Sequence, residues 1–334
     1  MNKKIPTTKL DKFDMAKKIA NFPEQFKAGL ESAKTVKLSK KVKNALVCGM
    51  GGSALPGIIL KMRGHVSLYI NQNYDLPSFI NESYLVICIS YSGNTQETLS
   101  SFRQALDRKL PAICITSGGK LAKLCKKRNI PLALVPKGYP PRIALGFQFA
   151  ALAKILIDCN LIKNNLKEIL GLEKEIETSL LKKQGKSLAN ELKNKILLIY
   201  SSEFNKNLAY VWKTNFNENS KIPAFFNYFP ELNHNELTGF KNKKYNNFHL
   251  IILKDKNDKS EIVKRMNLTS KILKNNGIKS SFVKVDTQNS LRGIFSNIIL
   301  SYWTSYYLAL ENKIDPTPVG LIEEFKKELK KTAI

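Results

Sequence analysis

The sequence has no uncharged apolar run approaching the roughly 18 residues that a membrane-spanning helix needs. Its first residues, MNKKIPTTKLDKF, also lack the apolar core of a secretory signal peptide. These two absences predict a protein that has no membrane partner and is not secreted.

The cysteines lack the C-x-x-C spacing of many metal and redox sites, and their total of five is odd. Three of them lie inside apolar runs, which favours buried, reduced thiols over a disulfide framework. This usage predicts a cytoplasmic protein. The five are Cys48, Cys88, Cys114, Cys125 and Cys159.

Acidic residues are half as numerous as basic ones, 27 against 54, which gives a formal charge of +27. Such an excess can indicate nucleic-acid binding. Here the basic residues are mostly lysines that are spread along the chain among many asparagines, so a compositional bias explains them better. No two-helix recognition pattern precedes the first predicted strand, and we expect no nucleic-acid partner. A positive surface would still attract an anionic substrate.

Short β-rich runs alternate with helical patterns in two successive parts of the 334-residue chain. This alternation predicts an α/β fold in which each of two parallel sheets is flanked by helices, as in doubly wound, flavodoxin-like proteins. A single amphipathic helical pattern at 11–32 precedes the first sheet. The predicted divisions are a first domain at 1–160, a helical connector at 161–194, a second domain at 195–314 and a helical tail at 315–334.

The loop VCGMGGSALPG follows the first predicted strand and opens a helix. Gly49, Gly51 and Ala54 fit the G-x-G-x-x-A pattern of dinucleotide-binding proteins. However, the second strand ends at Asn71 without the expected acidic residue, and the nearest carboxylate, Asp75, lies beyond it. No G-K-[ST] follows the glycines either, which excludes a P-loop.

The stretch SYSGNTQET joins the apolar run SYLVICI to a predicted helix that starts near Thr95. Such a turn presents backbone N–H groups and the positive end of the helix dipole. Ser90, Ser92 and Thr95 add hydroxyl groups, and Gly93 allows close approach to the backbone. An ordinary helix cap needs only one hydroxyl. The pattern therefore favours a phosphate cradle that contains no lysine.

Several charged residues further along the chain have both a functional and an ordinary explanation. Arg142, in PPR before a long apolar helix, either meets an anionic partner or forms a surface salt bridge. His234 lies between Glu231 and Glu236 in FPELNHNEL, whereas His249 lies in a strand and His65 in a turn. Each of the two glutamates is a candidate base beside the histidine.

The predicted last helix, at 319–331, carries an apolar stripe at helical spacing. The stripe consists of Val319, Ile322, Phe325 and Leu329. Lys326 lies within it, four residues after Ile322, so its side chain either reaches out to solvent or serves a site.

Several of these motifs occur together and in a fixed order. GMGGSALPG, SYSGNTQET and PPRIALG resemble those of sugar isomerase (SIS) domains. With KTNFNENSKIPAFFNYFPELNHNE and DPTPVGLIEEFKK, they closely resemble the bifunctional phosphoglucose/phosphomannose isomerase family from about residue 10 to residue 330. The resemblance implies two SIS domains and a substrate site at their junction.

The same resemblance implies the roles of individual residues. Phosphate would be bound by Ser90, Ser92 and Thr95, while Gly52, Ser53 and Arg142 would face the sugar. Proton transfer would fall to Glu218, His234 and Lys326, with Glu218 as the base. Glu231 and Glu236 remain alternatives, because spacing alone does not separate the three carboxylates.

The activity implied is the interconversion of glucose 6-phosphate and mannose 6-phosphate with fructose 6-phosphate through an enediol, a step of glycolysis and gluconeogenesis. The three scattered histidines do not match the clustered ligands of metal-dependent phosphomannose isomerases, so we expect no metal or other cofactor. The resemblance also implies a homodimer whose subunits help to complete the site. The alternative is a sugar-phosphate-binding SIS regulator without catalysis.

Overall fold

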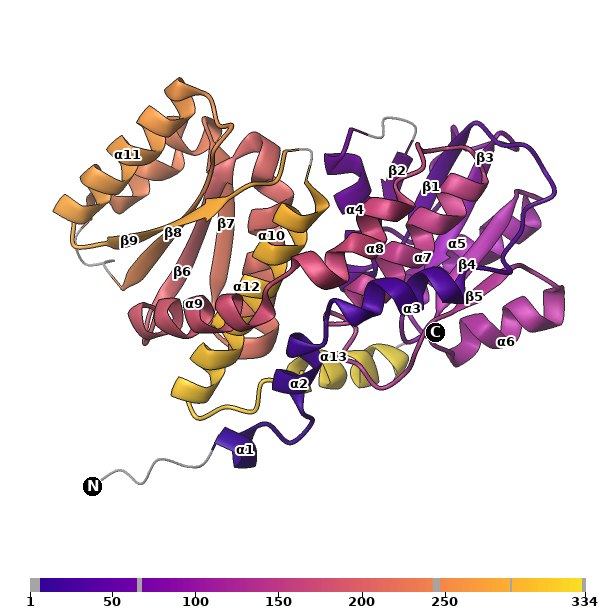
Figure 1. Cartoon of the computed structure of the whole chain (residues 1–334), viewed down its shortest axis with the longest axis horizontal. Coiled ribbons are helices and arrows are strands. Elements are labelled where there is room, and N and C mark those ends of the chain that lie inside the picture. Colours follow the sequence, from indigo (N-terminus) through magenta and orange to yellow (C-terminus); the bar gives the residue numbers. More distant parts are fainter. Residues whose placement is uncertain (1–6, 65–67, 243–246, 289, 332–334) are drawn as a thin grey trace. The chain divides into compact units, whose positions relative to one another are not determined.

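The structure is a computed structural model that describes residues 7–64, 68–242, 247–288 and 290–331 (Figure 1). Its contacts divide the chain into two compact units. The first domain comprises residues 20–177 and 287–295, and the second comprises the other described residues. The second domain thus includes the described residues up to Ile19 and helix α9 (Thr178–Glu191), which the sequence-based boundaries place in the first domain and in the connector.

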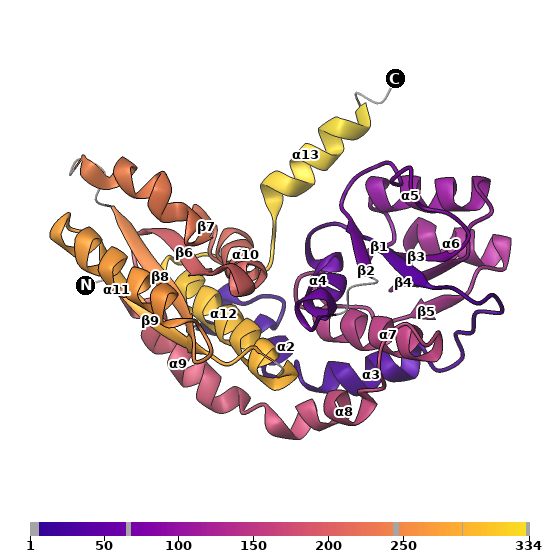
Figure 2. The same ribbon diagram turned by 90° about the horizontal axis from the view of Figure 1, so that it is seen from above.

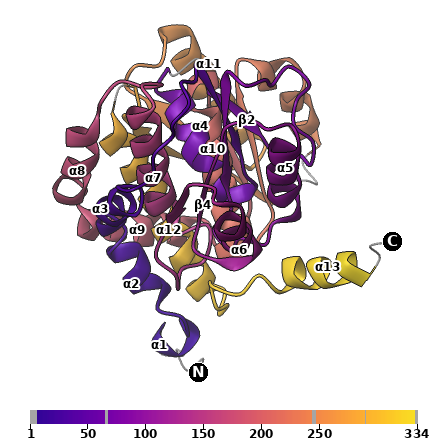
Figure 3. The same ribbon diagram turned by 90° about the vertical axis from the view of Figure 1, so that its right-hand side faces the viewer.

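The first domain contains a five-stranded parallel sheet in the order β2-β1-β3-β4-β5. Helices α5 and α6 pack on the face that carries Leu46 and Cys88, and α4 packs on the opposite face against Val47. Figures 2 and 3 show α5 on the side opposite α7. Its elements are α3 (Glu24–Ser32), β1 (Asn44–Cys48), α4 (Leu55–Met62), β2 (Leu68–Asn71), β3 (Tyr84–Ile89), α5 (Gln96–Asp107), β4 (Ala112–Thr116), α6 (Gly119–Arg128), β5 (Leu132–Leu134), α7 (Leu145–Asp158) and α8 (Leu166–Glu175).

The second domain repeats this plan with four parallel strands in the order β7-β6-β8-β9. Helix α11 packs against Tyr200 and Leu250 on one face, and α10 contacts Phe226 on the other (Figure 1). Its elements are α1 (Thr7–Leu10), α2 (Met15–Ala20), α9, β6 (Ile196–Ser202), α10 (Lys206–Asn215), β7 (Ala224–Phe229), β8 (Phe248–Asp255), α11 (Ser260–Asn275), β9 (Lys279–Val285), α12 (Leu291–Glu311) and α13 (Gly320–Lys331).

The predicted fold class is confirmed in both domains. In each sheet the second strand in chain order lies outside the first, and the later strands extend the sheet on the other side. This is the arrangement of flavodoxin-like sheets, which bind ligands beyond the carboxyl ends of their strands. The three central strands of the first sheet are almost fully buried, as their continuous apolar runs predict.

The structure departs from the predicted elements at two places. The single helical pattern at 11–32 forms two helices, α2 and α3, because Pro23 caps a new helix and has no N–H to continue the preceding one. Strand β7 was not among the predicted strands, since Asn227 interrupts its apolar run AFFNYF and the run does not alternate regularly. His65 lies outside the described residues.

Helix α12 is strongly apolar and begins within the first domain. There the Phe295 ring packs between the rings of Phe26 and Phe149, with centroid distances of 4.7 and 4.8 Å. Even so, no helix within the described ranges has both the length and the apolar content needed to cross a membrane.

Candidate active site

The predicted phosphate cradle lies where β3 ends and α5 begins. Ser90 Oγ and Thr95 Oγ1 lie 2.9 Å apart, and the Asn94 N–H donates to Ser92 Oγ at 3.3 Å. Thr95 occupies the N-cap position of α5, but its side chain makes no capping hydrogen bond to the helix. Ser92 is exposed and Thr95 is half-buried. The hydroxyls therefore gather at the positive end of a helix, as an anion site requires.

Glycines allow a second turn to approach this cradle closely. Gly93 has φ +66°, and a Cβ added to it would lie 1.8 Å from the carbonyl oxygen of Gly118. A Cβ on Gly119, at φ +70°, would lie 2.3 Å from the carbonyl oxygen of Ser92. Both positions combine a left-handed backbone with a backbone neighbour, so only glycine fits them without strain.

The structure also brings Gly52, Ser53 and Arg142 together within the first domain. A Cβ on Gly52 would lie 3.1 Å from Cα of Arg142, so the two loops that carry them pack on each other. Arg142 is only 5% exposed, which argues against the surface salt bridge that was one of its two explanations. Ser53 Oγ donates to Gln148 Oε1 at 2.8 Å and accepts from the Tyr91 N–H at 3.2 Å. The Ser53 hydroxyl therefore joins α7 to the cradle turn.

In the second domain, Glu218 lies in the five-residue turn at 216–220 that continues α10. Its neighbours anchor this turn to α12: Asn219 Nδ2 donates to Ser305 Oγ at 2.9 Å, and Ser220 Oγ donates to the Ser305 carbonyl at 2.7 Å. The pKa of the Tyr210 phenol is raised by burial and by the negative charge of Glu218. Glu218 is thus a half-buried carboxylate on a firmly held turn, with a phenol close by.

His234 and Glu218 are attached to opposite faces of the second sheet. His234 ends the segment 231–234, whose Leu232 packs into the same core as Tyr200 and α11. Glu218 follows α10, which contacts Phe226 on the other face. Side chains alternate along a strand, so Phe226 and its neighbour Asn227 point to different sides. Among the described residues, no element of the second domain brings the two predicted proton-transfer groups onto one face.

Helix α13 forms as predicted, but its apolar stripe is exposed. Ile322, Phe325 and Leu329 are 42%, 65% and 37% exposed, and Leu321 is 83% exposed. The expected packing face that would enclose Lys326 is therefore not formed in the structure, and the role of this lysine stays a prediction.

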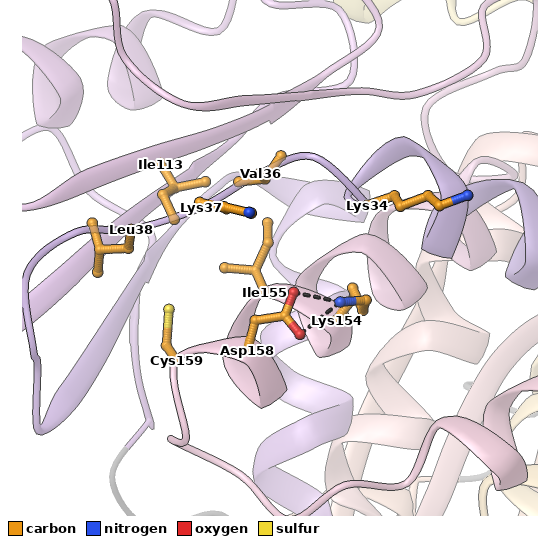
Figure 4. A pocket seen from close by; sticks show the side chains of 9 residues that line it. All are labelled: Lys34, Val36, Lys37, Leu38, Ile113, Lys154, Ile155, Asp158 and Cys159. Atoms are coloured by element: carbon orange, nitrogen blue, oxygen red, sulfur yellow. Dashed lines mark hydrogen bonds and ion pairs between the residues drawn. The ribbon is translucent and has the colours of Figure 1, made fainter.

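A cavity of about 470 Å³ in the first domain lies apart from these residues (Figure 4). Ile113, near the start of β4, lines it, whereas the cradle follows the end of β3. Lys154 and Asp158 form an ion pair at its side, and Lys37 also lines it. None of the predicted site residues contributes to its lining.

Within the described part of the chain, no group of three or more histidine, cysteine, aspartate and glutamate side chains is arranged to hold a metal ion.

The fold and the motifs together define an SIS-type α/β protein. Residues 181–329 match the family model described as the bacterial phospho-glucose isomerase C-terminal SIS domain. A solved structure of a hypothetical protein from Thermus thermophilus has the same fold, with a TM-score of 0.75 and 14% identity over 96% of this chain and 91% of that one.

Two curated relatives identify the family. The bifunctional phosphoglucose/phosphomannose isomerase of Aquifex aeolicus is 38% identical over 87% of this chain and 92% of its own length. That of Caldicellulosiruptor bescii is 33% identical over 94% of this chain and 98% of its own length. The chain belongs to the bifunctional phosphoglucose/phosphomannose isomerase family.

Replacing Gly93 with alanine should destabilise the first domain and weaken phosphate binding, because the new Cβ would meet the Gly118 carbonyl. Gly138→Ala is the matched control: its φ is +93°, but nothing lies within 4 Å of the added Cβ. The control should cost only about 1–2 kcal/mol for the left-handed backbone. Urea unfolding and calorimetric titration with fructose 6-phosphate measure both effects. Equal losses in the two variants would show that the close approach of the turns does not shape the cradle.

Proposed function

We propose that this protein interconverts glucose 6-phosphate and mannose 6-phosphate with fructose 6-phosphate. The observation that carries the proposal is the likeness to bifunctional isomerases over nearly the whole chain, combined with a formed hydroxyl cradle at the start of α5. The five cysteines are unpaired, which suits a reducing compartment, and we expect the enzyme to work in the cytoplasm.

The cradle would bind the substrate phosphate through Ser90, Ser92, Thr95 and the N–H groups at the start of α5. The positive end of the helix dipole favours the dianion there. Gly52, Ser53 and Arg142 would shape the adjoining surface that faces the sugar. A net charge of +27 would help to collect anionic substrates from solution.

Isomerisation would then proceed by proton transfer. With the ring open, the carboxylate of Glu218 removes the proton from C2 of the aldose while the C1 carbonyl oxygen takes up a proton, which gives an enediol. The same group then returns a proton to C1 while the C2 hydroxyl loses its proton, which gives the ketose. His234 would assist ring opening at the ring oxygen, and Lys326 would stabilise negative charge on the sugar oxygens. Return of the proton to either face of C2 would give glucose or mannose products.

We further propose a homodimer in which Glu218 of one copy and His234 of another act on the same substrate. Two observations support it. The two groups are attached to opposite faces of the second sheet, and the edge strand β7 exposes Phe225 and Phe226 by 55% and 37%. An exposed apolar edge strand is a surface that proteins normally cover. A second copy of this chain would cover it and complete the site.

We expect activity with both glucose 6-phosphate and mannose 6-phosphate, at rates that survive EDTA. One base that serves C1 and C2 can produce both epimers without a metal. A coupled assay that offers each substrate separately, before and after chelator treatment and dialysis, tests this. An absolute preference for one epimer would limit the protein to a single isomerase activity, and loss of turnover with EDTA would refute the metal-free mechanism.

Glu218→Gln and His234→Ala should fail in different ways. The glutamine keeps the shape of the side chain but cannot accept a carbon-bound proton, so turnover should fall by about 10²–10⁴-fold or more. Bound fructose 6-phosphate should also stop exchanging hydrogen with deuterated water, as followed by NMR. The His234→Ala defect should shrink on an open-chain analogue. Wild-type exchange in Glu218→Gln would transfer the role of base to Glu231 or Glu236.

Mixing the two inactive variants tests the shared site. A hybrid dimer would hold one intact Glu218 and His234 pair, so equal mixing with random exchange of subunits should restore about a quarter of wild-type activity. Refolding the variants together, with each refolded alone as the control, gives the comparison. If the subunits are shown to exchange and activity is still not restored, then Glu218 and His234 act from the same chain.

A further inference from the structure

His234 lies in a short segment that is held to helix α11 on one side and to the second sheet on the other. On one side Asn233 Nδ2 donates to Thr269 Oγ1 of α11 at 2.9 Å. On the other side the Glu236 carboxylate accepts hydrogen bonds from Tyr200 Oη and Asn227 Nδ2. The histidine itself is exposed, so its position depends on these neighbours rather than on its own packing.

The Glu236 carboxylate uses both of its oxygens in this anchorage. Tyr200 donates to Oε1 and Asn227 donates to Oε2. Tyr200 is 1% exposed, and burial together with the Glu236 charge raises the pKa of its phenol, so the hydroxyl remains a donor. The side-chain Oδ1 of Asn227 accepts a hydrogen bond from the Tyr228 N–H at 2.8 Å. The side-chain Nδ2 of Asn227 is thereby turned to Glu236.

The backbone around Glu236 is held as well. Asn235 Oδ1 accepts from the Glu236 N–H at 2.6 Å, and Asn235 Nδ2 donates to Glu231 Oε1 at 2.8 Å. The segment from Glu231 to Glu236 is therefore closed on itself by Asn235 and attached to β6 and β7 through Glu236. Both carboxylates that compete with Glu218 as the base are occupied in holding this segment.

We propose that Glu236 is a positioning residue, which holds the segment that carries His234 against Tyr200 and Asn227 and takes no proton from the substrate. The inference rests on the proposed function, because it assumes that His234 assists catalysis. Without the carboxylate, a buried phenol and an amide would lose their acceptor, and the segment would shift to satisfy them. A displacement of about 1 Å of a catalytic group can cost about 10²-fold in rate.

The experiment compares Glu236→Ala, Tyr200→Phe and the exposed control Glu261→Gln, each alone and combined with His234→Ala. Steady-state kinetics use cyclic glucose 6-phosphate and an open-chain analogue. Glu236→Ala should lower kcat on the cyclic substrate by about 10–100-fold with little change in KM. The loss should be smaller on the open-chain analogue. In the His234→Ala background, the second substitution should add almost nothing.

Tyr200→Phe keeps the aromatic ring in the core and removes only the donor, so it should reproduce the pattern more weakly. If Glu236→Ala does not fold, Tyr200→Phe tests the same hydrogen bond. Glu261→Gln should leave activity unchanged, since Glu261 lies exposed in the first turn of α11 and accepts a hydrogen bond from Ser260 Oγ.

Each contrary outcome identifies what has failed. Two outcomes would overturn the role of Glu236 and leave the proposed function intact. One is a loss of kcat from Glu236→Ala that adds fully to the loss from His234→Ala. The other is wild-type activity of Glu236→Ala when His234→Ala is defective. Loss of deuterium exchange in Glu236→Ala, with normal exchange in Glu218→Gln, would make Glu236 the base. Wild-type turnover by His234→Ala would instead overturn the proposed role of His234.

Discussion

The close approach of two glycine turns at the carboxyl end of the first sheet is the constraint on which the cradle depends. Gly93 and Gly119 let the cradle turn and the start of α6 share backbone contacts that no larger residue permits. The Leu121 N–H, in the first turn of α6, donates a hydrogen bond to the Gly93 carbonyl at 2.9 Å. This N–H group at the start of α6 is therefore bonded to the protein itself. The beginning of α5 is thereby held in place, with the hydroxyls of Ser90 and Thr95 gathered beside it.

Some polar side chains near the predicted site hold other protein groups. Ser53 and Glu236 both lie in stretches that resemble motifs of the family, and each is engaged with protein partners in the structure. Such internal hydrogen bonds act together with buried apolar neighbours, Ala54 beside Ser53 and Leu232 near Glu236. The exposed His234 is then placed by buried Leu232 and by two polar anchors.

The fold class was predictable from sequence because continuous apolar strands require helices on both faces. The gathering of hydroxyls at the start of α5 was predictable because hydroxyls and a glycine coincide at a strand end, whereas phosphate binding there stays a prediction. The position of Glu218 relative to His234 was not predictable, since it depends on which face α10 covers. The exposure of the α13 stripe was not predictable either: periodicity indicates an apolar face, and only a structure shows whether something covers it. Strand β7 was missed because its run AFFNYF is neither continuously apolar nor regularly alternating.

Three cysteines of the first domain form a row across its sheet. Cys48 lies beside Cys88, Cys88 lies beside Cys114 on the next strand, and Cys125 of α6 is buried with them. Contact with Cys88 and burial raise the pKa of Cys48, and burial, with the adjacent Cys125, raises that of Cys114. The thiols of Cys48, Cys88 and Cys114 remain protonated and unreactive while the domain is folded. Alkylating reagents therefore reach these three buried thiols only when the domain opens, so the rate at which they are alkylated measures how often it opens.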